Sequence, residues 1–438
     1  MAKPKGIERR RDMLTSRERV NLALNHQEAD RIPVDLGGSL ATGMHVSTVY
    51  RLRQALGLDK PGTPVKVIEP YQMLGEIKPD LMEAFGIDVI NLSGAKNLFG
   101  YKNEAWKPWT FFNGIPMLVP GDFNTELEPN GDVLMYPEGD RSAPPSGRMP
   151  KGGFFFDTIV RQPPLDERNL KVEDNLQEFG PISTEDLEHF RREAEQLHTG
   201  TDKAIFAGLP GTAFGDIALV PAPWMKYPRG IRDLEEWYVA TASRPDFVRE
   251  IFEQQCEIAL ANLTRIYEAV GNRIAAVWTT GTDFGMQNGP FISPKTYRDL
   301  YQPFHRRINH WIHEHTSWKS LIHSCGSVRA LLNDFIAAGF DILNPVQCSA
   351  ARMNPAELKA EFGHRLTFWG GGVDTQRTLP FGTPDEVRRE VRERIEIFGP
   401  GGGFVFAAVH NIQACTPVEN VLAMFETVRE CGRYPLRA

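Results

Sequence analysis

KSLIHSCGSVRALLNDFIAAG, residues 319–339, is the stretch that decides the fold. It begins with a short apolar segment, Lys319 to His323, which has the length of a buried strand. A polar turn through Gly326 follows, and from Val328 to Ala338 apolar residues recur at helical spacing. Gly339 then supplies the usual C-terminal stop of a helix. The stretch therefore predicts one strand, one turn and one helix.

The same unit recurs along the chain. Most of its strands are continuous apolar runs without alternation, which is typical of parallel strands that are buried on both faces. Eight such units predict a closed (β/α)8 (TIM) barrel. The eight predicted strands are Ile32 to Leu36, Asp88 to Leu92, Ala204 to Leu209, Ile274 to Thr279, Lys319 to His323, Asp341 to Pro345, Leu366 to Trp369 and Phe404 to Val409.

Two segments add to the barrel. Before the first strand, Thr15 to Asn25 opens with a capping-box pattern and predicts an N-terminal helical extension. Between Trp109 and Phe156, two Asn-Gly pairs flanked by apolar residues predict an inserted β-hairpin region. We therefore expect a single barrel domain over residues 1–438, with a β-rich insertion at about 105–160.

Composition narrows the classes of function. The 438 residues carry a formal net charge of -7, which gives no basic surface for nucleic acid. No segment has the roughly 18 consecutive apolar residues of a membrane span, and no apolar stretch follows the basic residues in Met1 to Arg11. The 5 cysteines are spread widely, which favours reduced thiols over a disulfide framework. We expect a cytoplasmic protein with small-molecule or protein partners.

In such a barrel the reactive groups follow the C-terminal ends of the strands. His323 and Cys325 alternate at the end of the fifth strand, so both side chains can face the same way. An imidazole and a thiolate suit Zn2+, and a third ligand from the eighth strand would leave one position open for catalysis. An ordinary buried His and Cys pair is the competing interpretation.

Other polar residues follow the remaining strands. We expect Asp283 and His323 to be catalytic residues, with Asp283 as an acid that also contacts the substrate. For Asp283, Gln287 and Asp374, the competing interpretation is a solvated loop position. Gly370 to Gly372 could either allow close approach of a ligand or form a tight barrel corner. His310, His313 and His315 are expected to face outward on a helix. The full set of expected substrate-binding residues is Asp35, Asp283, Gln287, Asn344 and Asp374.

Several stretches resemble the uroporphyrinogen decarboxylase superfamily. Met13 to Val20, followed by Asp30 to Val34, is similar to the opening of that superfamily. Ile322 to Gly326 resembles the His-x-Cys element of its methylcobamide:coenzyme M methyltransferases, and Thr416 to Val421 resembles the segment after their last strand. The resemblance spans nearly the whole chain, except for the insertion, and it implies a TIM barrel.

The resemblance also implies a zinc site made of His, Cys and a second Cys. Counted back from Glu419, the position of that second Cys holds His410 here. The expected ligands are therefore His323, Cys325 and His410, with Cys415 or Cys348 as alternatives for the third.

The resemblance implies a zinc-dependent methyltransferase that moves a methyl group between a small methylated donor or acceptor and a corrinoid (cobalamin) carried by a partner protein. A decarboxylase or lyase acting on a carboxylated substrate is the alternative. The decarboxylase branch holds its tetrapyrrole with arginines after the first strand, where this chain has Asp35 to Ser39. The expected partners are thus a corrinoid protein and a small molecule, without nucleic acid or membrane, and a homodimer is the assembly to test.

Overall fold

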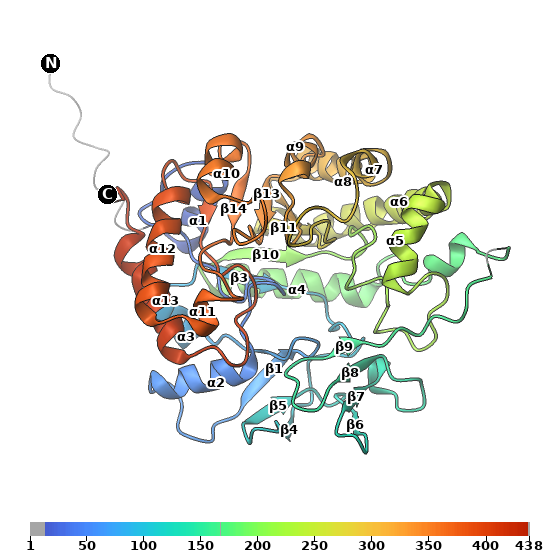
Figure 1. Cartoon of the computed structure of the whole chain (residues 1–438), viewed down its shortest axis with the longest axis horizontal. Helices are drawn as coiled ribbons and strands as arrows, with labels where there is room; N and C mark the ends of the chain where they lie inside the picture. The colour runs from blue at the N-terminus through green and yellow to red at the C-terminus, as the bar shows by residue number, and fades with distance from the viewer. Residues whose placement is uncertain (1–13, 167, 437–438) are drawn as a thin grey trace.

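A parallel sheet of seven strands forms the centre of the molecule (Figure 1). The computed structural model describes residues 14–166 and 168–436, so Met1 to Met13, including the first residue of the opening motif, lie outside it. Strands neighbour one another in the order β15-β14-β13-β12-β11-β10-β3, and each pair is parallel. Their bounds are β3 Val89–Leu92, β10 Ala204–Gly208, β11 Ile274–Thr280, β12 Lys319–His323, β13 Ile342–Asn344, β14 Thr367–Trp369 and β15 Phe404–Val405.

The predicted first strand, Ile32 to Leu36, differs from the other seven. It closes the barrel between β15 and β3, but only through an isolated bridge from Val34 to Phe406 and a bond from the Asp88 N–H to the Val34 carbonyl. Pro33 has no N–H, and the N–H of Val34 donates to the Asp88 carboxylate at 2.9 Å. The expectation of a regular strand was therefore wrong here, although the segment occupies the eighth position of a (β/α)8 barrel.

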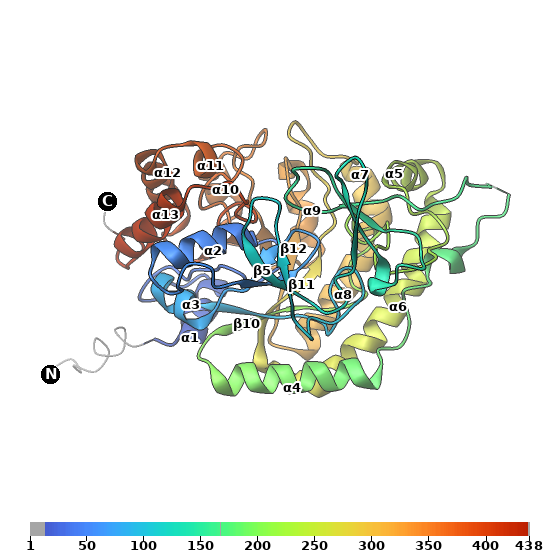
Figure 2. The ribbon, with the colours of Figure 1, turned by 90° about the horizontal axis from the view of Figure 1, so that it is seen from below.

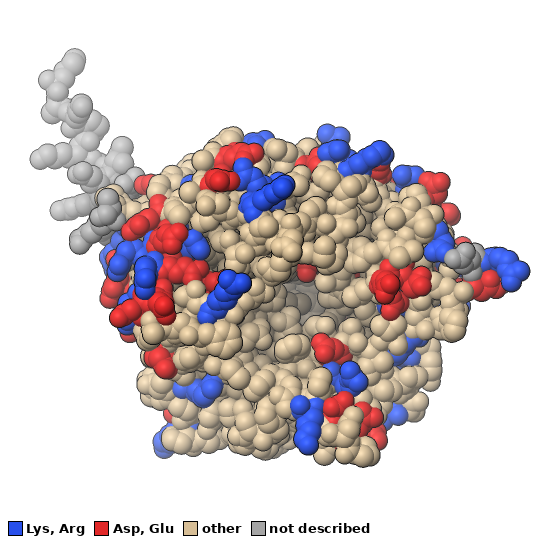
Figure 3. Space-filling view, in the orientation of Figure 1, with Lys and Arg blue, Asp and Glu red and all other residues tan. Residues whose placement is uncertain are grey.

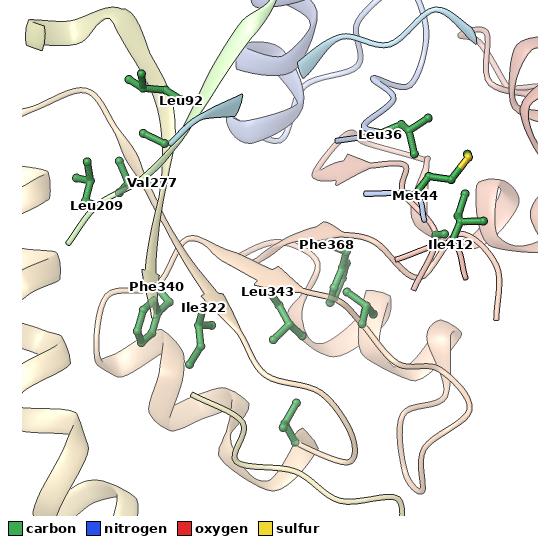
Figure 4. Packing of buried hydrophobic residues seen from close by; sticks show 14 of the residues in the cluster. Leu36, Met44, Leu92, Leu209, Val277, Ile322, Phe340, Leu343, Phe368 and Ile412 are labelled. Carbon is green, nitrogen blue, oxygen red and sulfur yellow. The ribbon is translucent and has the colours of Figure 1, made fainter. Parts of the chain in front are cut away.

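Alternation along each strand sorts side chains between two cores. On β12, Leu321 belongs to the cluster inside the barrel and Ile322 to the cluster between the sheet and the helices. Figure 4 shows the outer cluster, where Ile322, Leu343 and Phe368 come from three neighbouring strands. By the same alternation His323 at the end of β12 returns to the barrel interior.

Helix α1, Ser16–Leu24, closes the N-terminal end of the barrel. Its Val20, Ala23 and Leu24 join the inner cluster, so the opposite end of the barrel is left for a site. The predicted capping box is confirmed, because Thr15 accepts from the Glu18 N–H and the Glu18 side chain accepts from the Thr15 N–H.

Helices surround the sheet in Figures 1 and 2. The predicted helix Val328 to Ala338 begins later than expected. A 3-10 turn, Arg329–Leu331, comes first, and α9 runs only over Leu332–Ala337, because the Leu331 N–H bonds to the Val328 carbonyl. The main outer helices are α4 Thr184–Gly200, α5 Leu234–Ser243, α6 Pro245–Val270, α8 Gln302–His315, α10 Pro355–Phe362, α12 Pro384–Phe398 and α13 Val418–Cys431.

The inserted hairpins lie together on one side of the barrel in Figure 1. β4 Lys107–Thr110 pairs with β5 Pro116–Val119, and β6 Thr125–Leu127 pairs with β7 Val133–Met135, each around a predicted Asn-Gly turn. β8 Gly147–Met149 and β9 Asp157–Thr158 extend the second sheet. The sequence did not predict β1 Val65–Glu69 and β2 Leu74–Gly75, which join the first sheet through a parallel pair with β5.

Two remaining helices, α2 Val46–Ala55 and α3 Pro79–Phe85, follow the first barrel segment. Within the described ranges, no helix has both the length and the apolar character needed to cross a membrane.

Candidate metal centre

His323, Cys325 and His410 meet at the C-terminal end of the barrel. One potential ligand atom from each lies within 4.8 Å of the others. The Cys325 Sγ is 3.5 Å from the His323 Nε2, and the two imidazole rings are 5.7 Å apart. His323 ends β12 and Cys325 lies two residues beyond it, whereas His410 arrives from the loop after β15. The fold thus brings together residues that are distant in sequence.

His323 is held in one orientation by its surroundings. Its Nδ1 lies 2.5 Å from the Asn344 Oδ1, and the indole of Trp278 stacks on its ring at 4.9 Å. The amide of Asn344 is itself fixed, because its Nδ2 donates to the Trp369 carbonyl at 2.7 Å. An Nδ1 proton donated to Asn344 leaves the Nε2 lone pair facing Cys325, which is the usual arrangement behind a metal-binding histidine.

Burial sets the charge of the three groups. It lowers the pKa of His323 to about 4, and burial followed by the nearby His323 lowers the pKa of His410 to about 3. Both imidazoles are therefore neutral at pH 7 and have a lone pair to offer. Burial also raises the pKa of the Cys325 thiol well above its usual value, so a thiolate here requires a neighbouring cation. Two imidazoles and a thiol of this kind fit Zn2+.

Asp283 lies behind this cluster, in the loop after β11. Its Oδ1 accepts the Cys325 N–H at 2.6 Å and lies 3.9 Å from the His323 Nε2. Burial raises the pKa of Asp283 to about 6. The expected acid therefore does lie beside His323, and its environment favours the protonated form more than water would.

A cleft of about 390 Å³ opens beside Cys325 and His410. Figure 3 shows a hollow at the centre of one face of the molecule, surrounded mostly by uncharged surface. Two of the expected substrate-binding residues, Gln287 and Asp374, line the cleft. The lining residues contain no Lys or Arg; they are Gly285, Met286, Gln287, Cys325, Gly326, Gln347, Ser349, Asp374, Thr375, Gln376, Val409 and His410.

Asp35 and Asn344 are not among the residues that line this cleft. Asp35 is buried, and its carboxylate accepts from Trp369 Nε1 and from the Gly38 N–H, each at 2.8 Å. Asn344 lies behind His323, as described above. The structure thus brings Gln287 and Asp374 to the cleft and Asp283 next to its cysteine, but places Asp35 and Asn344 among protein partners.

The alternative cysteines are placed differently from His410. Cys415 is exposed, and Cys348 directs its Sγ to the Val346 carbonyl at 3.4 Å. Neither belongs to the cluster of ligand atoms. His310, His313 and His315 are exposed on α8, as expected.

The three glycines after β14 form a tight corner. A Cβ at Gly370 would lie 2.3 Å from the Pro345 carbonyl oxygen, and one at Gly372 would lie 2.4 Å from the Phe406 ring. Protein atoms therefore occupy the space around these glycines, and of the two interpretations left open by the sequence the structure supports the tight corner.

Sequence reasoning missed three residues of the site. Trp278 lies on β11 itself, not after it, and only its stack on His323 reveals it. Asp216 is buried at 7 % exposure, and burial followed by the charge of Asp283 raises its pKa to about 6. Gln347 lines the cleft from the loop after β13. Its position after a predicted strand was the available signal, but the residues expected there were Asn344, at the end of β13, and Cys348.

Comparison with known proteins supports the resemblance to the uroporphyrinogen decarboxylase superfamily that the sequence motifs indicated. The uroporphyrinogen decarboxylase (URO-D) family profile matches residues 217–431. A uroporphyrinogen decarboxylase from Actinobacillus succinogenes is 35% identical over 81 residues, which is 18% of this chain and 22% of that protein. The methylcobamide:CoM methyltransferase MtaA of Methanosarcina barkeri is 24% identical over 194 residues, 44% of this chain and 51% of the relative.

The chain thus spans about a fifth of one curated relative and about half of the other. Among solved structures, a methyltransferase from Methanosarcina mazei matches with a TM-score of 0.53 at 18% identity, over 95% of this chain and 99% of that chain. That likeness shows a shared fold over 95% of this chain. The family profile over residues 217–431, the two relatives and the shared fold all relate this chain to the uroporphyrinogen decarboxylase superfamily.

Proposed function

We propose that this protein is a zinc-dependent methyltransferase that moves a methyl group between a small molecule and a corrinoid on a partner protein. The observation that carries the proposal is the convergence of His323, Cys325 and His410 within 4.8 Å, beside a cleft. The similarity to a methylcobamide:CoM methyltransferase supports the same reaction class. Three protein ligands leave a fourth position for the reacting heteroatom.

Each residue of the centre has a proposed part. His323, Cys325 and His410 would hold Zn2+, and Asn344 keeps the His323 ring turned so that Nε2 faces the site. When bound, zinc supplies Lewis acidity, which activates a thiol or stabilises a departing heteroatom. Asp283 would exchange a proton with that heteroatom, because its raised pKa keeps a protonated fraction near neutral pH.

The cleft accounts for the other partners. A volume of about 390 Å³ falls in the usual range of small-molecule sites. The corrinoid would stay on its own protein and approach the face that Figure 3 shows, where few charged side chains surround the hollow. A cytoplasmic location and a single barrel domain over the whole chain belong to the same proposal.

Decarboxylation of a carboxylated substrate is the weaker candidate. The match to a uroporphyrinogen decarboxylase favours it. However, carboxylates are usually bound by Arg or Lys, and the residues that line the cleft include neither. We therefore place methyl transfer first.

Single-turnover spectroscopy tests the proposal. Zinc-loaded protein should convert methylcobalamin to Co(I) cobalamin in the presence of a thiol, or methylate Co(I) with an O-, N- or S-methyl donor. Removal of zinc by a chelator should abolish either reaction, and added zinc should restore it. If the zinc-loaded protein performs neither reaction with any donor or thiol, the proposal is wrong.

A further inference from the structure

Gln347 lines the cleft and carries a buried hydrogen-bond donor that has no partner in the described chain. It is only 6 % exposed, and its Oε1 accepts the Gly326 N–H at 2.8 Å. Because that backbone group needs an acceptor, the amide oxygen must face Gly326, and the orientation of the side chain is fixed. Its Nε2 is buried and has no hydrogen-bond partner within the described ranges. A buried N–H without an acceptor is unfavourable unless a bound molecule completes it.

The backbone that carries Gln347 is strained. Val346 has a φ of 60°, which is rare for a β-branched residue. The neighbouring loop holds it there, since a Cβ at Gly371 would lie 3.2 Å from the Val346 Cβ and carbonyl oxygen. Strain of this kind persists only where surrounding structure imposes it, and it is concentrated at functional sites. Here the strained backbone at Val346 places the Gln347 side chain in the lining of the cleft.

The charges of the cleft restrict what the amide can bind. Its lining includes Asp374 but no Lys or Arg, and the Asp283 carboxyl lies behind Cys325. In the zinc-free protein an anionic ligand would therefore lose its hydration without gaining a countercharge. An uncharged oxygen with a lone pair has no such penalty and can accept from an amide N–H.

We propose that Gln347 is a substrate-binding residue that donates its Nε2 hydrogen to an uncharged oxygen, such as that of a methyl ether or an alcohol. This inference builds on the proposed function, because it names the class of its methylated substrate. It selects neutral oxygen compounds over carboxylates and sulfonates.

Binding to the zinc-free protein tests the inference without any catalysis. The probes are 2-methoxyethanol and methoxyacetate, which share a methyl ether and differ in charge. In protein labelled with 15N-glutamine, the side-chain amide signal of Gln347 is the one missing from Gln347→Glu or Gln347→Asn. We expect this signal to shift with 2-methoxyethanol, and at least ten times more methoxyacetate to be needed for the same shift. The inference is overturned if 2-methoxyethanol leaves the signal unmoved, as it would if water completes the amide, or if both probes act equally.

Gln347→Glu provides the kinetic arm. It keeps an oxygen for the Gly326 N–H but replaces the donor with an acceptor. We expect KM for a neutral methyl ether to rise at least tenfold, with zinc content unchanged. Gln196→Glu on the exposed face of α4 is the matched control and should leave KM unaltered. An unchanged KM in Gln347→Glu would also overturn the inference.

The two proposals fail in different ways. A shifted Gln347 signal without methyl transfer would refute the methyltransferase and keep the binding role of Gln347. Methyl transfer with an unmoved Gln347 signal would do the reverse.

Discussion

Asn344 lies behind His323 of the proposed metal centre and is not among the residues that line the cleft. Its Oδ1 is 2.5 Å from the Nδ1 of His323, and this contact fixes which ring nitrogen faces Cys325. Residues in this position behind a metal ligand usually change metal affinity by about 10- to 100-fold. We therefore expect Asn344 to act by orienting the His323 ring.

Asn344→Ala should weaken zinc binding by about 10- to 100-fold, because the His323 ring loses its partner. Competition with a chromogenic chelator measures this affinity. Asn333→Ala, which removes an exposed amide on α9, serves as the control. Wild-type zinc affinity in Asn344→Ala would show that Asn344 does not orient a ligand.

Asp283→Asn should lower the rate of methyl transfer by about 100-fold or more, because the amide cannot exchange a proton with the substrate. The amide oxygen can still accept the Cys325 N–H, so the site should keep its zinc. Single-turnover rates and metal analysis on the same sample separate the two effects. A variant with full zinc and an undiminished rate would remove Asp283 from the chemistry.

At the scale of elements, the loops after β13 and β14 support each other. Gly370 has a φ of 120°, and an added Cβ would meet the Pro345 carbonyl oxygen at 2.3 Å. Backbone strain and overpacking each cost about 1–3 kcal/mol. These loops carry Gln347, so their packing also shapes the cleft.

Gly370→Ala should reduce the free energy of unfolding by about 2 kcal/mol or more, as measured by chemical denaturation. Gly289→Ala is the matched control in another loop at this end of the barrel, since a Cβ there has no heavy atom within 4 Å. Equal stability of the two variants would contradict the tight corner.

The π-helical turn Tyr297–Tyr301 and α8 bury a histidine in an aromatic cluster. His305 is fully buried, its Nδ1 lies 3.0 Å from the Tyr297 hydroxyl, and burial lowers its pKa to about 3. The folded protein therefore holds His305 neutral, whereas the unfolded chain takes up a proton below its ordinary pKa near 6.5. Its contribution to stability is present above pH 6.5 and is lost as the pH falls towards 3.

Wild-type protein should thus lose about 2 kcal/mol of stability through His305 alone between pH 8 and pH 5. His305→Phe should lack this part of the pH dependence, whatever its stability at pH 8. Urea unfolding of both proteins at the two pH values gives the difference. The same pH dependence in both proteins would mean that His305 is not held neutral by the fold.

At the scale of the whole molecule, much of the barrel could be predicted from the sequence. Parallel strands buried on both faces leave continuous apolar runs, and seven of the eight predicted runs are strands in one sheet. The segment from Ile32 to Leu36 was predicted as a regular strand but does not form one. Pro33 and the Asp88 carboxylate replace backbone pairing there, and apolar patterning does not record this. β1 and β2 were not predicted, because they complete a sheet whose other strands come from the insertion.

The site was predictable only in part, for a similar reason. His323 and Cys325 are neighbours in sequence, and strand alternation alone places them on one side. His410 joins them through closure of the barrel, so the resemblance to a family was needed to select it over Cys415. Trp278 acts through its stack on the His323 ring and Gln347 through its bond to the Gly326 N–H, and apolar patterning does not record such contacts between elements.

The zinc content of Cys325→Ala, compared with that of Cys415→Ala, shows whether His323, Cys325 and His410 hold a metal ion. Both variants remove one thiol, but only Cys325 lies in the cluster with His323 and His410, whereas Cys415 is exposed. Mass spectrometry of metals should find about one zinc per chain in the wild type and in Cys415→Ala, and almost none in Cys325→Ala. Zinc retained by Cys325→Ala, or a wild type that binds none, would contradict the metal centre proposed here.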